Sequence, residues 1–382
     1  MNLACSWSEY GMNDRPLTIY IIAGEASGDF LGARLMRALK ARHPDIRFHG
    51  IGGPKMAEEG LSSLFPYHEL SLMGFVEILP YLLKIAGRIN LAVEDALAKQ
   101  PDLVITIDSP GFCFRVVERL RKAQLTAKFV HYVAPTVWVY KPERAERCVR
   151  LFDHLLLLLP FESPYFEKVG LPCTFIGHPI VAETDRGDGS RFRKKYEIPD
   201  NVQLFCLLPG SREGEIKRHM PIFARTVAGL ASRYRNFAIV VAVPTYAMES
   251  IARYFQNCPF RAVITSNEED KKDALTAANL AITKSGTIAL EIAQAGTPMI
   301  IAHRVNPLSA WLLRRQALTS HVNLINILHK KEIVPEMLQD LGTPELLAGA
   351  AFSLLASPSR QSIHKEYAQT ALAMLTPADK IF

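Results

Sequence analysis

The feature of this sequence that most constrains its fold is an alternation of short apolar runs with longer amphipathic segments. Three of the runs are LTIYII from Leu17, DLVITID from Asp102 and HLLLLLP from His154, and their apolar residues are nearly continuous. Strands of a parallel sheet have this pattern, because helices cover both faces of the sheet. The alternation therefore predicts a doubly wound α/β fold.

The alternation occurs twice, on either side of a charged stretch that contains glycine, AETDRGDGS from Ala182 to Ser190. Such a composition is typical of a linker. We therefore expect one Rossmann-like domain over residues 1–182, a second over residues 190–343, and C-terminal helices over 344–382 that can pack back toward the first domain. Ligands of these folds bind at the carboxyl ends of the strands, which predicts a cleft between the two domains as the site.

Composition limits the classes of function that remain. The chain has 382 residues, of which 49% are hydrophobic, and this is enough for two cores. Its six cysteines are far apart and form no C-x-x-C pair, so we expect reduced thiols and a cytoplasmic protein. The net charge of +6 is dispersed, which does not predict nucleic-acid binding but suits an anionic small molecule or membrane face. Neither a secretory signal nor a membrane span is predicted, and Met1 and Met12 are both candidate start residues.

The first predicted strand leads into a glycine-rich loop, AGEASGDFLGARL. Its glycines, Gly24, Gly28 and Gly32, are four residues apart, whereas a dinucleotide-binding loop needs the spacing G-x-G-x-x-G. This spacing argues against a plain NAD-binding function. The helix that follows has unpaired N–H groups at its start, and these favour the binding of some other anion.

A turn in the second half also suits an anion. In LLPGSREGEIKRH, Gly210, Ser211 and Arg212 lie between a predicted strand and a predicted helix. Backbone N–H groups and a planar guanidinium at such a turn can bind a phosphate. An ordinary turn with a solvated arginine explains the same residues equally well.

A second turn of this kind, KSGTIALE, favours phosphate binding over the interpretation as an ordinary turn. Ser285 or Thr287 can cap the helix, and Gly286 between them allows a ligand to approach closely. Glu291, one turn further on, can accept hydrogen bonds from the vicinal hydroxyls of a ribose, or can simply complement the helix dipole. Two such helix starts in one domain favour a nucleoside diphosphate as the ligand.

A candidate base lies in the first half. Asp108 ends the apolar strand LVITID, a position that suits a general base, although capping of the following loop SPGF is an alternative role. Glu25, Asp29 and His131 also lie at strand ends and are weaker candidates. No cluster of residues has metal-ligand spacing, so we expect no metal and no cofactor.

The segment LFPYHELSLMGFVEILPYLLKIAGRIN, from Leu64 to Asn90, is dense in apolar residues, and basic residues follow them. Packing in a core explains this density. The alternative is an apolar helix that holds acyl chains and rests on an anionic membrane. The residues that would make this contact are Leu72, Met73, Phe75, Val76 and Leu79.

Taken together, these motifs resemble those of the lipid-A-disaccharide synthase family, glycosyltransferases of lipopolysaccharide assembly. The matching stretches run in order from Ile22 to Glu336. They are AGEASGDFLGARL, IGGPKM, LSLMGFVEILP, IDSPGF, HYVAPTVWVY, LPFESPYFEKVGLPCTFIGHP, LLPGSREGEIKR, SGTIALE and NILHKKEIVPE. In addition, EIAQAGTP resembles the nucleotide-sugar segment of the glycosyltransferase that adds N-acetylglucosamine in peptidoglycan synthesis.

The resemblance implies two Rossmann-like domains in the GT-B arrangement and a single-displacement, inverting transfer. The donor would be UDP-2,3-diacylglucosamine, the acceptor 2,3-diacylglucosamine 1-phosphate, and the products a β-1,6 disaccharide 1-phosphate and UDP. It also implies a peripheral protein at the inner face of the cytoplasmic membrane, and a homodimer stays open.

The resemblance assigns roles to residues as well. Asp108 would deprotonate the acceptor hydroxyl. The loop that would contact a sugar or phosphate of the lipid substrates contains Gly24, Glu25, Ser27, Gly28 and Asp29. The residues that would hold the UDP-sugar are Gly210, Ser211, Arg212, Ser285, Gly286, Thr287, Glu291 and Asn326.

Three positions depart from the family's usual pattern, and two rival functions remain. Gly111 in IDSPGF replaces an acid, NLIN keeps Asn326 but lacks a proline, and Lys284 adds a charge before SGT.

One rival is a UDP-sugar epimerase of similar two-domain fold, which would not need the apolar segment. The other is a sugar-binding protein without chemistry, which would normally need a secretory signal.

Overall fold

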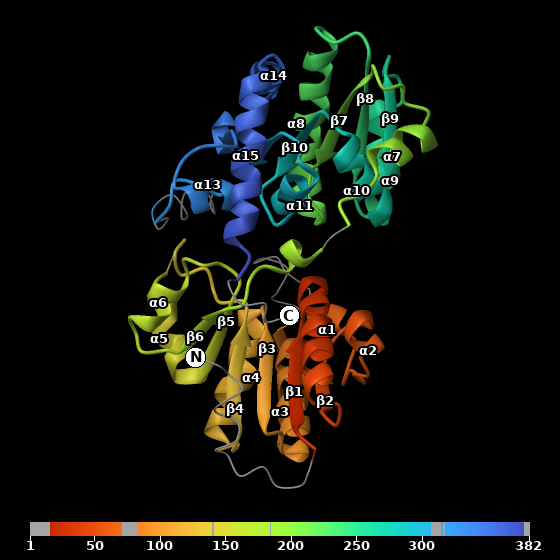
Figure 1. Ribbon diagram of the computed structural model, residues 1–382. Coiled ribbons are helices and arrows are strands. Elements are labelled where there is room, and N and C mark those ends of the chain that lie inside the picture. Colours follow the sequence, from red (N-terminus) through yellow and green to blue (C-terminus); the bar gives the residue numbers. More distant parts are fainter. Residues whose placement is uncertain are drawn as a thin grey trace. The chain divides into compact units, whose positions relative to one another are not determined.

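The structure is a computed structural model that describes residues 16–70, 82–139, 141–183, 185–306, 315 and 318–377. The chain divides into two compact units, one of residues 1–176 with 377–382 and the other of residues 177–376. Within the described residues, each unit is built on its own six-stranded sheet (Figure 1).

The first unit has the strand order β2-β1-β3-β4-β5-β6, and all neighbouring strands are parallel. Its strands are β1 (Thr18–Ala23), β2 (Arg47–Ile51), β3 (Leu103–Ile107), β4 (Lys128–Tyr132), β5 (His154–Leu157) and β6 (Cys173–Phe175). The described helices of this unit are α1 (Ala26–Arg42), α2 (Pro54–Glu58), η2 (Tyr67–Leu70), α3 (Leu82–Lys99), α4 (Pro110–Lys122), α5 (Arg144–Leu151) and α6 (Ser163–Glu167).

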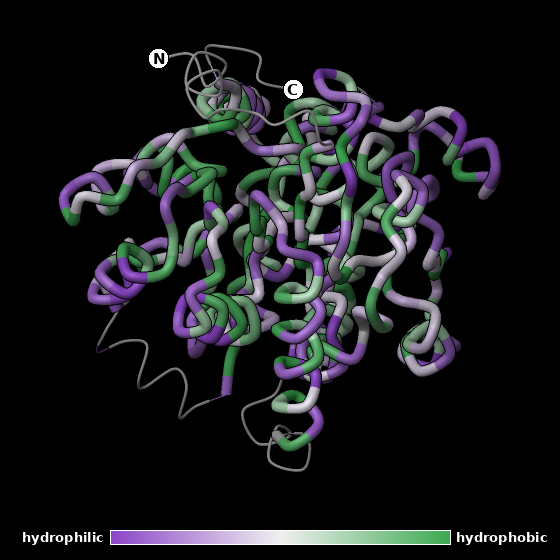
Figure 2. Tube along the Cα trace, turned by 90° about the horizontal axis from the view of Figure 1, so that it is seen from below, coloured by the Kyte–Doolittle hydropathy of each residue, from purple (hydrophilic) through white to green (hydrophobic). Residues whose placement is uncertain are grey.

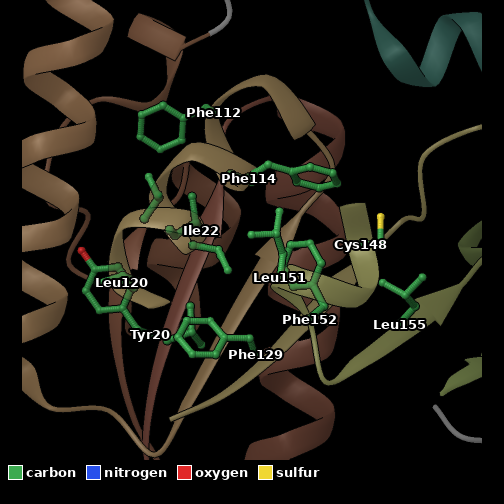
Figure 3. Packing of buried hydrophobic residues seen from close by; sticks show 14 of the residues in the cluster. Tyr20, Ile22, Phe112, Phe114, Leu120, Phe129, Cys148, Leu151, Phe152 and Leu155 are labelled. Carbon is green, nitrogen blue, oxygen red and sulfur yellow. The ribbon is translucent and has the colours of Figure 1, made fainter. Parts of the chain in front are cut away.

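Alternate residues of these strands pack on opposite faces of the sheet. Tyr20 and Ile22 belong to one apolar cluster together with residues of α3 and α4, and Figure 3 shows this cluster with Phe112 of α4. Ile19 and Ile21 belong to a second cluster with residues of α1 and α2. Helices therefore cover both faces, which is why the central strands β1 and β3 are apolar at nearly every position.

The second unit repeats this plan with the strand order β12-β11-β10-β7-β8-β9, again all parallel. Its strands are β7 (Gln203–Leu208), β8 (Phe237–Ala242), β9 (Arg261–Thr265), β10 (Leu280–Lys284), β11 (Met299–His303) and β12 (Glu336–Leu338). The described helices are η4 (Pro179–Ala182), α7 (Gly189–Lys195), α8 (Glu213–Ala231), η5 (Thr245–Ala247), α9 (Met248–Ala252), η6 (Arg253–Phe255), α10 (Glu268–Ala277), α11 (Ile288–Ala295), α13 (Leu324–His329), η7 (Gln339–Leu341), α14 (Pro344–Leu355) and α15 (Pro358–Met374).

The C-terminal helices belong to the layers of this second unit. Phe205 and Leu207 of β7 pack with residues of α8 and α14, whereas Leu204 and Cys206 pack on the other face with residues of α10, α11 and α15. Along the helices in Figure 2, hydrophobic and hydrophilic residues alternate within single turns, as expected where one side of a helix faces a sheet.

The doubly wound α/β fold that the sequence predicts is confirmed in both units. Among the described helices, none combines the length and the hydropathy that crossing a membrane requires.

Candidate active site

In both units, most of the predicted site residues that the structure describes lie near the point where the strand order reverses. In the first sheet, β2 lies on one side of β1 and β3 on the other. In the second sheet, β8 lies on one side of β7 and β10 on the other. Loops that leave two such strands diverge onto opposite faces of the sheet, and this leaves room for a ligand at the strand ends. The loops after β1, β3, β7 and β10 contain Gly24 and Glu25, Asp108, Gly210–Arg212 and Ser285–Thr287, while Ser27, Gly28 and Asp29 lie in the first turns of α1.

In the first unit, glycines bring the loops after β1 and β3 into contact. A Cβ atom on Gly24 would lie 3.0 Å from the Oγ atom of Ser109, and one on Gly28 would lie 3.3 Å from the Cβ atom of Ala23. Glu25 is half-buried and occupies the N-cap position of α1, while Ser27 is exposed in its first turn. The glycines of GEASGD therefore serve close packing of α1 against the strand ends.

Asp29 has a structural role. Its carboxylate is 3% exposed and accepts hydrogen bonds from the backbone N–H groups of Gly53 (2.8 Å), Lys55 (3.1 Å) and Met56 (3.0 Å). These groups form the N-terminus of α2, where a carboxylate stabilises the helix. Asp29 thus joins α1 to α2, and its carboxylate is engaged by the start of α2.

Asp108 lies in a strained turn. Asp108 and Ser109 both have left-handed backbones, with φ of +50° and +44°, and α4 then begins at Pro110. Asp108 is half-buried, and its backbone N–H donates to the carbonyl oxygen of Tyr132 at 2.9 Å. Val133, at the end of the neighbouring strand β4, also has a positive φ of +72°. Each such residue costs about 1–3 kcal/mol, and this kind of strain concentrates at functional sites.

His131 is a core residue. It is fully buried, its Nδ1 atom lies 2.7 Å from the Oγ1 atom of Thr106, and its ring stacks on Phe152 at 4.9 Å. Burial lowers the pKa of His131 to about 3, so the ring is neutral at physiological pH. Gly111, by contrast, is exposed, and a Cβ atom there would meet no atom within 4 Å among the described residues.

Sequence reasoning did not single out Glu162, which follows β5. The residue is 3% exposed, and its carboxylate accepts hydrogen bonds from the Trp138 indole N–H and from the backbone N–H of Leu159, each at 3.1 Å. Burial raises the pKa of Glu162 to about 7, and the hydrogen bonds only partly oppose this. The signal in the sequence was a single acid in the apolar strand-end motif LPFESP.

In the second unit, Glu215 organises the turn after β7. Its Oε2 atom accepts the backbone N–H groups of Ser211 at 3.2 Å and of Arg212 at 3.4 Å. Gly210 has a φ of +117°, and a Cβ atom there would lie 2.5 Å from the same oxygen. Only glycine fits this position. Arg212 is exposed at the N-cap of α8.

An ion pair brings the two predicted nucleotide-binding turns together. The Nζ atom of Lys284, the last residue of β10, lies 2.8 Å from the Oε1 atom of Glu215. Burial alone would raise the pKa of Glu215, but the hydrogen bond and charge of Lys284 more than offset this and leave the pKa below its usual value. An acid at the third position of a helix is a recognised capping signal, so Glu215 was accessible from sequence although its pairing with Lys284 was not.

The turn after β10 presents two exposed residues and one buried residue. Gly286 and Thr287 are exposed immediately before α11, where backbone N–H groups lack helical partners. Ser285 is 8% exposed, and its hydroxyl donates to the carbonyl oxygen of Val322 at 2.9 Å. Ser285 therefore ties this turn to the segment before α13.

Glu291 already has a cationic partner. Its Oε2 atom lies 3.0 Å from the Nζ atom of Lys271, on α10, and its side chain is 29% exposed. Burial raises the pKa of Glu291, and Lys271 only partly opposes this. A small polar pocket beside it is lined by Glu183, Asp185, Arg186, Lys272, Leu275, Gln294 and Ala295.

Asn326 is fully buried and holds a loop together. Its amide NH₂ donates to the carbonyl oxygen of Val334 (2.8 Å) and to Glu336 (2.9 Å). Its oxygen accepts the backbone N–H groups of Ile333 (2.8 Å) and Val334 (2.9 Å). All four of its hydrogen-bonding positions are occupied within the protein. Asn326 therefore shapes the loop rather than reaching toward a ligand.

The residues predicted to contact acyl chains or a membrane, Leu72, Met73, Phe75, Val76 and Leu79, lie outside the described residues. Next to them, Leu83 at the start of α3 is 88% exposed. Lys84 and Arg88 both pair with Glu69, at 3.3 and 2.7 Å. In the part of the chain that the structure describes, no group of three or more His, Cys, Asp or Glu side chains is placed to hold a metal ion.

Solved structures share this fold at low identity. An S. aureus MnaA–UDP co-structure aligns with a TM-score of 0.65 and 13% identity, covering 96% of this chain and 94% of that one. A UDP-GlcNAc 2-epimerase from Neisseria meningitidis, bound to UDP-GlcNAc, gives 0.61 and 10%, covering 94% and 99%. MurG from Acinetobacter baumannii gives 0.55 and 15%, covering 95% and 96%. These likenesses support the two-domain fold of GT-B glycosyltransferases and epimerases alike.

Relatives found by sequence distinguish the glycosyltransferases from the epimerases. A lipid-A-disaccharide synthase of Rhodospirillum centenum is 47% identical over 347 residues, which are 90% of this chain and 86% of the relative. Another of Granulibacter bethesdensis is 42% identical over 338 residues, covering 88% and 86%. The model of the family described as lipid-A-disaccharide synthetase matches residues 19–379. The chain therefore belongs to the lipid-A-disaccharide synthetase family.

Proposed function

We propose that the chain transfers 2,3-diacylglucosamine from UDP-2,3-diacylglucosamine to the 6-hydroxyl of 2,3-diacylglucosamine 1-phosphate. The products are a β-1,6-linked disaccharide 1-phosphate and UDP. The observation that carries this function is the family match over residues 19–379, which makes the chain a glycosyltransferase of lipid A biosynthesis.

In this proposal, Asp108 is the general base. A sugar hydroxyl is a poor nucleophile at neutral pH, and a positioned carboxylate removes its proton as the bond to the anomeric carbon forms. The left-handed turn of Asp108 and Ser109 at the end of β3 supports this role, because strained backbone of this kind concentrates at functional sites. Glu25, half-buried on the neighbouring loop, is the next candidate.

The second unit binds UDP in this proposal. Arg212 and the N–H groups before α11, at Gly286 and Thr287, contact the diphosphate and stabilise the charge that develops on it as UDP leaves. Glu291 binds the ribose hydroxyls and gives up part of its contact with Lys271 when it does so. Gly210, Ser211, Ser285 and Asn326 shape these loops through the hydrogen bonds described above.

A single assay separates the transferase from the epimerase that shares its fold. The protein is incubated with UDP-2,3-diacylglucosamine with and without the acyl-glucosamine 1-phosphate acceptor, while UDP and disaccharide are measured. Release of UDP that depends on the acceptor is expected. Formation of a new UDP-sugar without acceptor would instead identify an epimerase, and binding without turnover would identify a sugar-binding protein.

We also propose that the protein is cytoplasmic and rests on the inner face of the cytoplasmic membrane. The apolar segment around Phe75 and the exposed Leu83 beside it support this. Because Glu69 neutralises Lys84 and Arg88 in part, apolar contact rather than charge should dominate. Replacing Phe75 and Leu79 by Ser should then reduce partition to anionic vesicles with folding intact, and an undiminished partition would refute membrane docking through this segment.

A further inference from the structure

The ammonium of Lys284 occupies the space between the two turns at the second switch point. It lies 2.8 Å from Glu215 of the turn after β7, and 3.7 Å from the point that a Cβ atom on Gly286 would occupy in the turn after β10. The Lys284 side chain is 22% exposed, so it is neither solvated freely nor sealed in the core. A ligand that touches both turns would lie against this ammonium.

The hydrogen bonds of this pair leave Lys284 with capacity for a ligand. Glu215 is engaged on both oxygens, Oε1 with Lys284 and Oε2 with the N–H groups of Ser211 and Arg212. An ammonium carries three N–H donors, of which Glu215 accepts one. The carboxylate thus fixes where the ammonium lies, and the remaining donors suit an anion.

The other titratable groups near this point add little competing charge. His219 accepts the backbone N–H of Arg304 through Nε2 at 3.0 Å, and its Nδ1 lies 2.8 Å from the carbonyl oxygen of Glu215, as in a neutral ring. Burial and, to a smaller extent, the charge of the nearby Lys284 together lower the pKa of His303 to about 4. Arg212 and Arg218 are exposed cations, and their charges act on Glu215 and on His303 respectively.

We propose that Lys284 is a second ligand of the UDP diphosphate, held in place by Glu215 and acting together with Arg212. This inference rests on the proposed function of the site as a UDP-sugar site. Lys284 keeps Glu215 as one partner and donates its remaining hydrogens to phosphate oxygens. It thereby stabilises the diphosphate both in the bound donor and as the leaving group.

The alternative is that Lys284 only fastens the two turns together. In that case the Glu215–Lys284 bond would matter and the positive charge would not. Removing either partner would then weaken UDP binding equally, and exchanging the two residues would restore it.

The test measures UDP and uridine binding by calorimetry for the wild type and five variants. Lys284→Met removes the charge at similar length, and Lys284→Arg keeps it. Glu215→Gln keeps an acceptor for the turn, and a double variant exchanges Glu215 and Lys284. The matched control is Lys217→Met on the exposed side of α8, which breaks a comparable pair with Glu213.

We expect Lys284→Met to weaken UDP binding by about 10- to 100-fold, the range for one charge-assisted hydrogen bond, while uridine binding is unchanged. The UDP affinity of Lys284→Arg and Lys217→Met should stay within about threefold of that of the wild type. Glu215→Gln should weaken UDP binding far less than Lys284→Met does. The variant with exchanged residues should not regain the UDP affinity of the wild type. Thermal unfolding of each variant checks that it is folded, and Lys284→Gln replaces Lys284→Met if that variant is not.

Equal losses in Glu215→Gln and Lys284→Met, recovery in the exchanged pair, or an unchanged UDP affinity in Lys284→Met would each overturn the inference. These outcomes differ from failure of the proposed function, in which the wild type itself would not bind UDP.

Discussion

The two switch points of this protein hold their polar residues by different means. The one between β1 and β3 relies on backbone conformation, because Asp108 and Ser109 are held in left-handed turns. The one between β7 and β10 relies on charge, because Lys284 and Glu215 join two helix starts with Arg212 beside them.

The difference matches the chemistry that we assign to each unit. A base must be held in a defined position at the site, and strained backbone of the kind found at Asp108 and Ser109 is concentrated at such positions. A diphosphate instead needs several donors and positive charge, and two helix starts with Lys and Arg provide those. The predictions below test this division, from the largest expected effect to the smallest.

The strongest test is Asp108→Asn, which keeps the shape of the side chain and removes its basicity. Turnover should fall by about 10²- to 10⁴-fold, while UDP affinity should stay nearly constant because the UDP site that we propose belongs to the other unit. Steady-state kinetics with both lipid substrates and calorimetry with UDP measure the two effects. The matched variant is Asp29→Asn, which should lower stability but retain turnover, since Asp29 caps α2. Near-normal turnover in Asp108→Asn with chemistry rate-limiting would place the base elsewhere, at Glu25 first.

The charged switch point is tested by Arg212→Ala. UDP binding should weaken by roughly 1.5–3 kcal/mol, because a charge-assisted hydrogen bond to the diphosphate is lost. Calorimetry measures this, with Arg225→Ala as control, an exposed arginine on the same helix that pairs with Glu345. An affinity like that of the control would remove Arg212 from the site.

Opposite pH dependences are expected for two acids, the buried Glu162 after β5 and the half-buried Glu215 in the turn after β7. The pKa of Glu162 is raised to about 7, so its contribution to stability is present below the unfolded value of 4.5 and is lost as pH rises toward 7. The pKa of Glu215 is lowered, so its contribution is present above the unfolded value and is lost as the solution becomes more acidic.

Chemical denaturation of Glu162→Gln and Glu215→Gln across pH checks both signs. Relative to that of the wild type, the free energy of unfolding of Glu162→Gln should rise by on the order of 2–3 kcal/mol between pH 5 and pH 8, because the glutamine forms no buried charge. The substitution Glu215→Gln should lower the free energy of unfolding least at the most acidic pH. A Glu162→Gln penalty that is independent of pH would show that its carboxyl group titrates normally.

The packing role of the first unit's glycines gives a smaller effect. A Cβ atom on Gly53 would lie 2.5 Å from the Asp29 carboxylate, so Gly53→Ala should displace the cap of α2 and cost about 1–2 kcal/mol. Gly87→Ala in α3 is the matched control, because its Cβ atom would meet nothing among the described residues within 4 Å. It should stabilise the protein by about 0.5–1 kcal/mol. The same sign for both variants in denaturation experiments would contradict this account.

The sequence by itself determined the fold class and the family, and it supplied the loops at which we propose the site. Apolar periodicity is a local property, so the strands around Ile19 and Phe205 could be read without knowing their neighbours. The motifs are also contiguous in the sequence: the one at Asp108 follows a strand of the first sheet, and those at Arg212 and Ser285 follow neighbouring strands of the second sheet, whose ends lie at one edge.

Only the tertiary structure decided which partner each side chain has. Lys284 and Glu215 meet because β10 pairs with β7, a register that no local pattern encodes. Asn326 matched a motif residue by residue, yet its amide is fully engaged by its own loop. The left-handed turn at Asp108 depends on the surrounding packing that holds a strained backbone, and propensity alone would not select it.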